Sequence, residues 1–200
     1  AVQSISASQV RLPGGFGVIG TVTLDKAAPV GGTVINLASS NIGVVTVDAT
    51  VTVPEGVTAA TFDIDANPVA NDTVVSVSAS KYETSQSLLL TIQAPTPSSL
   101  SYLSSPISGG TSTTATISIS GPAPVGGTVV SLASSSLSAL VPTSVTIPAG
   151  QMTATFTVST NLVANDTSAV ISAIVYGVKV KSTLSILGPK VTSVTVASAS

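Results

Sequence analysis

The sequence predicts an all-β protein built as two β-sandwiches in tandem. Three observations support this prediction. Apolar and polar residues alternate with a period of two along most of the chain, and no helical period persists. Blocks of sequence recur later in the chain in the same order. Turn residues, above all Gly-Gly, Pro-x-Gly and Asn-Asp, separate the alternating segments at intervals of roughly 8–14 residues.

The recurring blocks define the length of the repeat. Pro-Val-Gly-Gly-Thr-Val at 29–34 returns at 124–129, a shift of 95 residues. Val-Ala-Asn-Asp-Thr at 69–73 returns at 163–167, a shift of 94, so the second copy lacks one residue near position 140. Because several independent blocks share one order, chance similarity is excluded. A unit of this length, roughly 100 residues, is an ordinary domain size.

The repeat divides the chain into two domains and a short remainder. We expect domains at 1–95 and 96–189, with residues 190–200 as a linker and the first strand of a further repeat. The start of the first repeat, Ser-Ile-Ser-Ala at 4–7, is matched by Ser-Val-Thr-Val at 193–196. These last residues are the beginning of a third copy, or a donor strand for a neighbouring subunit.

Alternation and turns place seven strands in each repeat. Gly14-Gly15 ends the first strand, Pro-Val-Gly-Gly the second, Pro54-Glu55-Gly56 the fourth and Asn71-Asp72 the fifth. In the first repeat the predicted strands are 3–9, 17–25, 33–39, 43–53 with an interruption, 58–65, 73–80 and 86–92. The phase of alternation buries Phe62, and Phe156 at the equivalent place in the second repeat. Seven short strands with one apolar face each predict an immunoglobulin-like seven-stranded β-sandwich in each repeat.

The residues also resemble a known family. Gly-Thr-Val-Thr-Leu, Pro-Ala-Pro-x-Gly-Gly, Leu-Ala-Ser-Ser, Val-Thr-x-Pro-x-Gly and Thr-x-Thr-Phe together resemble tandem bacterial immunoglobulin-like (Big-type) repeats, although each copy shows only some blocks in full. Such repeats occur in extracellular surface proteins, adhesins and fibres, usually as spacers. The resemblance implies the sandwich fold and an extracellular, cell-surface location. The paired Cys and core Trp of antibody domains are absent from the sequence.

Composition excludes most kinds of chemistry. The chain has no His and no Cys, which removes thiol nucleophiles, His-based triads, disulfides and Cys/His metal sites. Six Lys and Arg among 200 residues are too few for a nucleic-acid-binding patch. The apolar runs are far shorter than the ~18 residues of a membrane span. We therefore expect no enzyme activity, no cofactor, no nucleic-acid partner and no membrane span.

The carboxylates are the remaining candidates for a metal site. Asp63 and Asp65 fall on the same face of one predicted strand, and Asp72 follows nearby. Oxygen-rich clusters of this kind can hold Ca²⁺. The equivalent positions of the second repeat are Thr157, Ser159 and Asp166, so a site common to both repeats is excluded. A solvated strand face is the favoured interpretation.

Asn71 and Asn165 are candidates for glycosylation. Each begins an Asn-Asp-Thr acceptor sequence, and both occupy the same predicted turn. The alternative is that Asn-Asp suits the turn itself, through local hydrogen bonds. We favour the turn interpretation, because attachment of a glycan requires a host with the machinery.

The outward-facing apolar residues raise the question of self-association. Six of them fall out of phase with the core: Ile19, Val34, Val74, Leu89, Val129 and Val170. They are either ordinary β-formers on exposed strands or residues that neighbouring repeats or subunits cover. The terminal segment adds an assembly strand as a candidate, with Val191, Val194 and Val196 on it, because an unpaired strand is a template for strand addition.

These observations favour a structural function. We expect a repeat segment of a secreted cell-surface fibre, stalk or sheath, associating with neighbouring repeats or subunits by strand exchange or lateral packing. The alternative is an adhesin module that binds a glycan or host protein through its inter-strand loops. That alternative predicts loops that differ between repeats and carry aromatic residues, whereas the loops here are near-copies.

Overall fold

The computed structural model describes residues 1–190. Within them the chain folds into two compact units, each built around a pair of β-sheets. The described residues contain no helix long and apolar enough to cross a membrane. The strands of the first repeat are β1 (Val2–Ala7), β2 (Arg11–Pro13), β3 (Gly17–Leu24), β4 (Thr33–Ser39), β5 (Val45–Val47), β6 (Thr50–Val53), β7 (Ala59–Ala66), β8 (Thr73–Lys81) and β9 (Thr84–Gln93).

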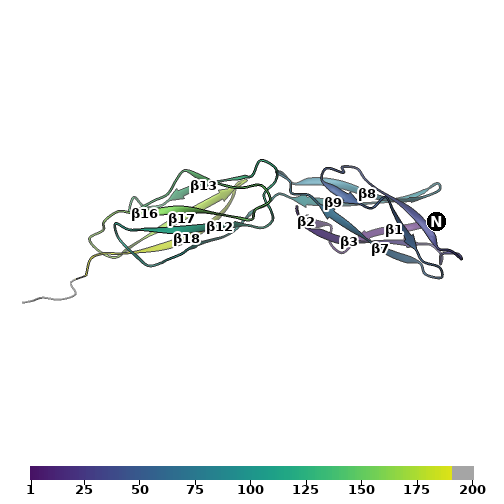
Figure 1. Cartoon of the computed structure of the whole chain (residues 1–200), viewed down its shortest axis with the longest axis horizontal. Coiled ribbons are helices and arrows are strands. Elements are labelled where there is room, and N and C mark those ends of the chain that lie inside the picture. Colours follow the sequence, from purple (N-terminus) through teal and green to yellow (C-terminus); the bar gives the residue numbers. More distant parts are fainter. Residues whose placement is uncertain (191–200) are drawn as a thin grey trace, which may run out of the picture. The chain divides into compact units, whose positions relative to one another are not determined.

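The first repeat is an immunoglobulin-like sandwich of two sheets (Figure 1). One sheet has four strands in the order β1-β3-β7-β5, and the other has five in the order β2-β9-β8-β4-β6. The first order matches the A-B-E-D sheet of the immunoglobulin fold, and β9-β8-β4 match its G-F-C strands. Neighbouring strands pair antiparallel, with the exception of β2 and β9, which run parallel.

The second repeat follows the same plan strand for strand. Its sheets have the orders β10-β12-β16-β14 and β11-β18-β17-β13-β15, so each strand is the counterpart of the one nine places earlier. β11 and β18 again pair in parallel. The strands are β10 (Pro97–Tyr102), β11 (Ile107–Ser108), β12 (Ser112–Ile119), β13 (Thr128–Ser134), β14 (Ala139–Leu140), β15 (Ser144–Ile147), β16 (Thr153–Thr160), β17 (Thr167–Val175) and β18 (Val178–Leu187).

The fold class predicted from the sequence is confirmed, with one strand added. β2 was not predicted, since three residues ending in proline give no alternation to recognise. The chain leaves the four-stranded sheet after Ala7 and joins the other sheet at Arg11. Leu12 then lies in the core, 1% exposed. Pro13 is tolerated because β2 is an edge strand that pairs with β9 alone.

The strand predicted at 43–53, with an interruption, is two strands that belong to different sheets. β5 pairs with β7 in the four-stranded sheet, and β6 pairs with β4 in the five-stranded sheet. The chain crosses between the sheets at Asp48-Ala49, both exposed. One predicted strand is therefore two short edge strands on opposite sheets.

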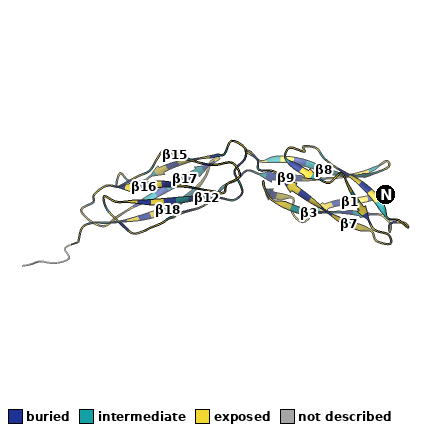
Figure 2. Cartoon of the chain, in the orientation of Figure 1, coloured by how far each residue is buried: buried dark blue, intermediate teal, exposed yellow. Residues whose placement is uncertain are grey.

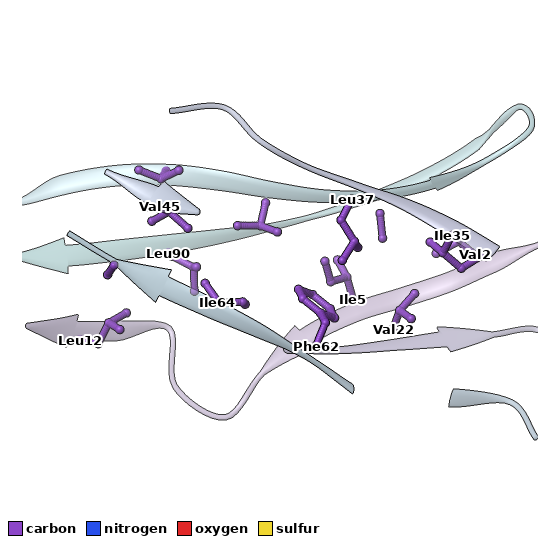
Figure 3. Close-up of a cluster of buried hydrophobic side chains, with 14 of the residues drawn as sticks. Val2, Ile5, Leu12, Val22, Ile35, Leu37, Val45, Phe62, Ile64 and Leu90 are labelled. Atoms are coloured by element: carbon purple, nitrogen blue, oxygen red, sulfur yellow. The ribbon is translucent and has the colours of Figure 1, made fainter. Parts of the chain in front are cut away.

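The predicted phase of burial is confirmed in both repeats. Phe62 and Phe156 are each 7% exposed. Buried and exposed residues alternate along the strands in Figure 2, as they do in β7, where every second residue from Phe62 to Ala66 is buried. Figure 3 shows the first core, in which Phe62, Ile64 and Val22 of one sheet face residues of the other. Those facing residues include Ile35, Leu37 and Leu90.

Most of the out-of-phase apolar residues are exposed, as expected. Ile19, Val34, Val74, Leu89 and Val129 are between 46% and 65% exposed. Val170 is half-buried. The candidate assembly strand with Val191, Val194 and Val196 lies outside the described residues, as does all of the expected third repeat after Lys190.

Candidate functional site

The Asn-Asp-Thr turns fasten the segment that leaves each sandwich. Asp72 Oδ1 accepts a hydrogen bond from the backbone N–H of Ala94 at 2.9 Å. Asp166 Oδ1 accepts the equivalent bond from Gly188, also at 2.9 Å. In each repeat a loop before the penultimate strand thus holds the first residue after the last strand, one position before a proline. We call these two hydrogen bonds the exit latches.

Each exit latch is accompanied by one further polar contact, which differs between the two repeats. In the first repeat Thr73 Oγ1 donates to the Asn71 carbonyl at 2.9 Å, which tightens the turn. In the second repeat Lys190 Nζ lies 3.6 Å from Asp166 Oδ2. Both partners of that ion pair are more than half exposed, so its contribution is at most about 1 kcal/mol.

A second loop at the same end of each sandwich is fixed by an asparagine. Asn67 Nδ2 donates to the Gly43 carbonyl at 3.1 Å, and Asn161 Nδ2 donates to Leu137 at 2.7 Å. The backbone N–H of each asparagine also bonds the residue after that acceptor, Val44 or Ser138. This pair was not predicted from the sequence, although both asparagines stand at the same place in the repeat.

The candidate glycosylation residues lie on the surface. Asn71 and Asn165 are exposed, each in a bend just before β8 or β17. Within residues 1–190 neither side-chain amide makes a hydrogen bond, whereas the neighbouring aspartates form the exit latches. The turn is therefore held by the second residue of the motif rather than by its asparagine. Glycan attachment at either asparagine stays a prediction.

The three aspartates considered for a metal have different surroundings. Asp63 and Asp65 lie on the outer face of β7, exposed, as the alternation indicated. Asp72 has one carboxylate oxygen in the exit latch. Among residues 1–190 no group of three or more acidic side chains has the arrangement that would hold a metal ion. The structure thus brings Asp63 and Asp65 to one face and places Asp72 in a loop.

Two exposed tyrosines are features that the sequence analysis missed. Tyr82 and Tyr176 occupy equivalent tips of the β8–β9 and β17–β18 hairpins, with φ of 53° and 46°. This left-handed region is unusual for a side chain of that size. Tyr82 is 93% exposed, and Lys81 Nζ lies 4.8 Å from the centre of its ring. The sequence could have indicated their equivalence, because the two tyrosines are 94 positions apart, which is the length of the repeat.

Among residues 1–190, Asp25 and Tyr102 have shifted pKa values. A hydrogen bond from the N-terminal ammonium lowers the pKa of the Asp25 carboxyl. Burial raises the pKa of the Tyr102 hydroxyl, and the hydrogen bond that this hydroxyl donates to the Ser182 carbonyl at 2.9 Å acts in the opposite direction. Tyr102 connects β10 to β18 across the second sandwich. Its counterpart in the first repeat is Ala7.

Comparison with known proteins gives neighbours in structure only. No family model matches the chain, and no curated protein matches it. Among solved structures, the D0-D1 domain of intimin matches at 13% identity, covering 93% of this chain and 98% of that chain, with a TM-score of 0.40. The Yersinia pseudotuberculosis adhesin InvE matches at 13% identity over 93% of this chain and 58% of that one, with a TM-score of 0.42.

A third neighbour in structure is a surface layer protein. Domains 4–9 of the surface layer protein SbsC match at 10% identity, covering 94% of this chain and 32% of that chain, with a TM-score of 0.34. Identities and scores this low do not bear on what the chain binds. The relationship to bacterial immunoglobulin-like repeats expected from the sequence therefore stays a prediction.

Proposed function

We propose that this chain is a load-bearing structural segment of an extracellular fibre or stalk at a cell surface. The observation that carries the proposal is the parallel pairing of an early strand with the last strand in both repeats. β2 pairs with β9 in the first sandwich, and β11 pairs with β18 in the second. The function is mechanical, because each repeat transmits tension between its two ends.

The geometry of the parallel pair determines how tension acts on it. β2 runs in register with β9 from Arg11 opposite Thr91 to Pro13 opposite Gln93. Pulling the two ends of the repeat moves β2 and β9 in opposite directions along their own length. The hydrogen bonds between them are then strained together in shear, because they run across the strands rather than along the pull.

Backbone hydrogen bonds extend this pair at both of its ends. The Thr91 N–H donates to the Val10 carbonyl at 2.8 Å, and the Gly14 N–H donates to Gln93 at 3.1 Å. In the second repeat the Gly109 N–H donates to Leu187 at 2.9 Å. Beyond the last strand, the exit latches hold Ala94 and Gly188. In each repeat the residue after the last strand, Ala94 or Gly188, is therefore held in place against the sandwich.

The remaining features of the chain suit this function. Charged residues make up 7% of the sequence, and the outer strand faces consist mainly of Ser, Thr and Val. Such faces repel one another weakly, which favours close packing at a surface. The chain has no His or Cys to supply a catalytic group, so we assign it no enzyme activity. The cell-surface location is part of the same proposal.

Single-molecule force spectroscopy with two pulling directions tests the proposal. The chain has no Cys, so one introduced thiol defines an attachment point. Pulling the two ends of the chain loads β2 and β9 in shear. Pulling the N-terminus against Glu83→Cys loads the first sandwich from one end, because Val2 N lies 3.3 Å from Thr84 Oγ1. We expect the first direction to need a several-fold higher force. Equal forces would overturn the load-bearing function.

A binding module is the second candidate, and Tyr82 is the observation that favours it. Its exposed ring stands beside a pocket of about 590 Å³ that Lys81 and the Asp25–Pro29 loop also line. An aromatic ring with a lysine suits a sugar or an acidic peptide. Glycan-array binding that Tyr82→Ala abolishes and Tyr176→Ala leaves intact would support this candidate. Binding that neither substitution affects would exclude the tip as the site.

A further inference from the structure

The two repeats differ in net charge although their folds match. Residues 1–95 contain three basic and seven acidic side chains, a net charge of −4. Residues 96–190 contain three lysines and one acidic side chain, Asp166, a net charge of +2. The structure shows where most of this difference lies. Four of the six units of difference come from Asp63 and Asp65 on one sheet face of the first sandwich and Lys179 and Lys181 on one sheet face of the second. The other charged residues lie in loops or at strand ends.

The acidic face is the outer side of the four-stranded sheet in the first sandwich. Asp63 and Asp65 point outward from β7, two residues apart, and Asp48 follows β5 at the neighbouring edge. All three are exposed. Ile19 lies directly opposite Asp63 on β3 and is 47% exposed. We call Asp63, Asp65 and Ile19 the acidic ladder.

The basic face is the outer side of the five-stranded sheet in the second sandwich. Lys179 and Lys181 point outward from β18, also two residues apart, and both are exposed. Ile174 lies directly opposite Lys179 on β17 and is half-buried. We call Lys179, Lys181 and Ile174 the lysine ladder. Each ladder therefore has two like charges on one strand, with an isoleucine across from the first of them.

Neither ladder is neutralised within its own sandwich. Among residues 1–190 the ion pairs are those of Asp25 with the N-terminus and of Lys190 with Asp166. The equivalent faces of the other repeat carry no charge at these positions. Thr157 and Ser159 replace the two aspartates in the second sandwich, and Ser85 and Ser87 replace the two lysines in the first.

We propose that the acidic ladder of one chain packs laterally against the lysine ladder of a second copy of this chain. This inference rests on the proposed structural function and adds a partner and an interface to it. The occupant of both faces is the same protein, because each chain carries one face of each sign. Since the two faces differ, every copy can bind one neighbour through each face, as the growth of a fibre or sheet requires.

The spacing of the charges allows both ion pairs to form at once. Residues two apart on one strand face are about 6.8 Å apart, so the carboxylates and the ammonium groups repeat at the same interval. Two sheets stacked face to face lie ~10 Å apart, which a lysine and an aspartate can bridge together. Ile19 and Ile174 supply apolar contact beside the charges. Exposed ion pairs are individually weak and are screened by salt, so we expect the contact to be salt-sensitive. Its total strength increases when many copies of the chain make the same contact side by side.

Reversal of the charges on one face at a time tests the interface. Self-association of the full chain is measured by sedimentation velocity over a concentration series, at low and high salt. We expect the wild-type chain to associate at low salt and to dissociate at ~1 M salt, where screening extends only about 3 Å. The variants Asp63→Lys/Asp65→Lys and Lys179→Glu/Lys181→Glu should each associate at least about tenfold more weakly, because like charges then face each other.

Combining the variants distinguishes this interface from a general charge effect. A mixture of the two variants should associate, and a chain with all four reversals should recover self-association. Glu55→Lys/Glu83→Lys is the matched control, because it changes net charge by the same amount on loops of the first repeat and should leave association unchanged. Association that survives both reversals, or that the control weakens equally, would overturn the interface. A chain monomeric at every salt concentration would also overturn it, while leaving the force measurement as a separate test of the structural function.

Discussion

Phe62 and Phe156 occupy equivalent places in the two sandwiches, and each is 7% exposed, but their neighbours differ. Phe62 lies opposite Gly20 on β3, whereas Phe156 lies opposite Ala115 on β12. A Cβ on Gly20 would overlap the Phe62 ring, so glycine makes room for that ring in the first core. The second core accommodates an extra methyl group at the same register position. The two repeats thus share one architecture while their cores are packed differently in detail.

The outer surfaces differ more than the cores do. Backbone and side-chain bonds at the ends of the sandwiches are duplicated, including the exit latches and the Asn67 and Asn161 bonds. The charged residues of the strand faces are not duplicated. We therefore expect the two repeats to behave alike at their ends and differently on their strand faces.

The largest effect is expected from truncating the central phenylalanine of either core. Phe62→Ala should lower the free energy of unfolding of the first sandwich by about 3–5 kcal/mol, because it removes buried area and leaves a cavity. Phe156→Ala should do the same to the second sandwich. Calorimetry of each variant should show one transition shifted and one retained. A shift of both transitions by one substitution would contradict the separate cores.

A smaller effect, confined to the first repeat, is expected from Gly20→Ala. The added methyl group must displace the Phe62 ring in a packed core, which typically costs about 1–3 kcal/mol. The matched variant Ala115→Gly removes a methyl group beside Phe156 and should destabilise the second sandwich by roughly 1 kcal/mol, through a small cavity and a more flexible strand. Chemical denaturation, followed separately for each sandwich, measures the change in the free energy of unfolding that each of the two substitutions causes. A neutral Gly20→Ala would show that the first core is as roomy as the second.

The smallest effect concerns Tyr102, which the first repeat replaces with Ala7. Tyr102→Phe removes the hydrogen bond to the Ser182 carbonyl and should cost about 0.5–1.5 kcal/mol. Burial raises the pKa of Tyr102 in the folded state. Its contribution to stability is therefore complete below the unfolded pKa of about 10 and is lost as pH rises through the folded value.

Alkaline denaturation measures this pH dependence. Above pH 10 the second sandwich of the wild-type chain should lose stability, because Tyr102 ionises more readily in the unfolded chain than in the folded one. Tyr102→Phe should remove that loss. The first sandwich, with Ala7 at this position, is the internal control. An unchanged pH profile in the variant would mean that ionisation of Tyr102 does not limit stability.

Much of the fold could be predicted from the sequence because it depends on local alternation and on repetition. The positions of Phe62 and Phe156, the turns and the two sheets per repeat follow from a period of two and from matched blocks. β2 could not be predicted in the same way. Three residues ending at Pro13 carry no pattern, and their pairing with β9 depends on contacts eighty residues away.

The candidate sites were less accessible to sequence reasoning. The Asn-Asp motif was recognised as a turn, but the hydrogen bond that the Ala94 N–H donates to Asp72 joins residues 22 positions apart. It follows from the pairing of the start of β8 with the end of β9. The ladders were also hidden, because Asp63 and Lys179 belong to different sheets of different repeats. Alternation had already placed Asp63 on a solvated strand face, but only the fold shows that Ile19 lies opposite Asp63 and Ile174 opposite Lys179.

Stretching the intact chain in a single-molecule force experiment tests the central claim most directly. We predict two unfolding events at comparable forces. Each should release a length just under ~33 nm, the extended length of one repeat at about 3.5 Å per residue. Two equal steps would establish that both repeats are independent mechanical units of one kind. A single step of about twice that length, or extension without a force peak, would contradict a load-bearing function of the two repeats.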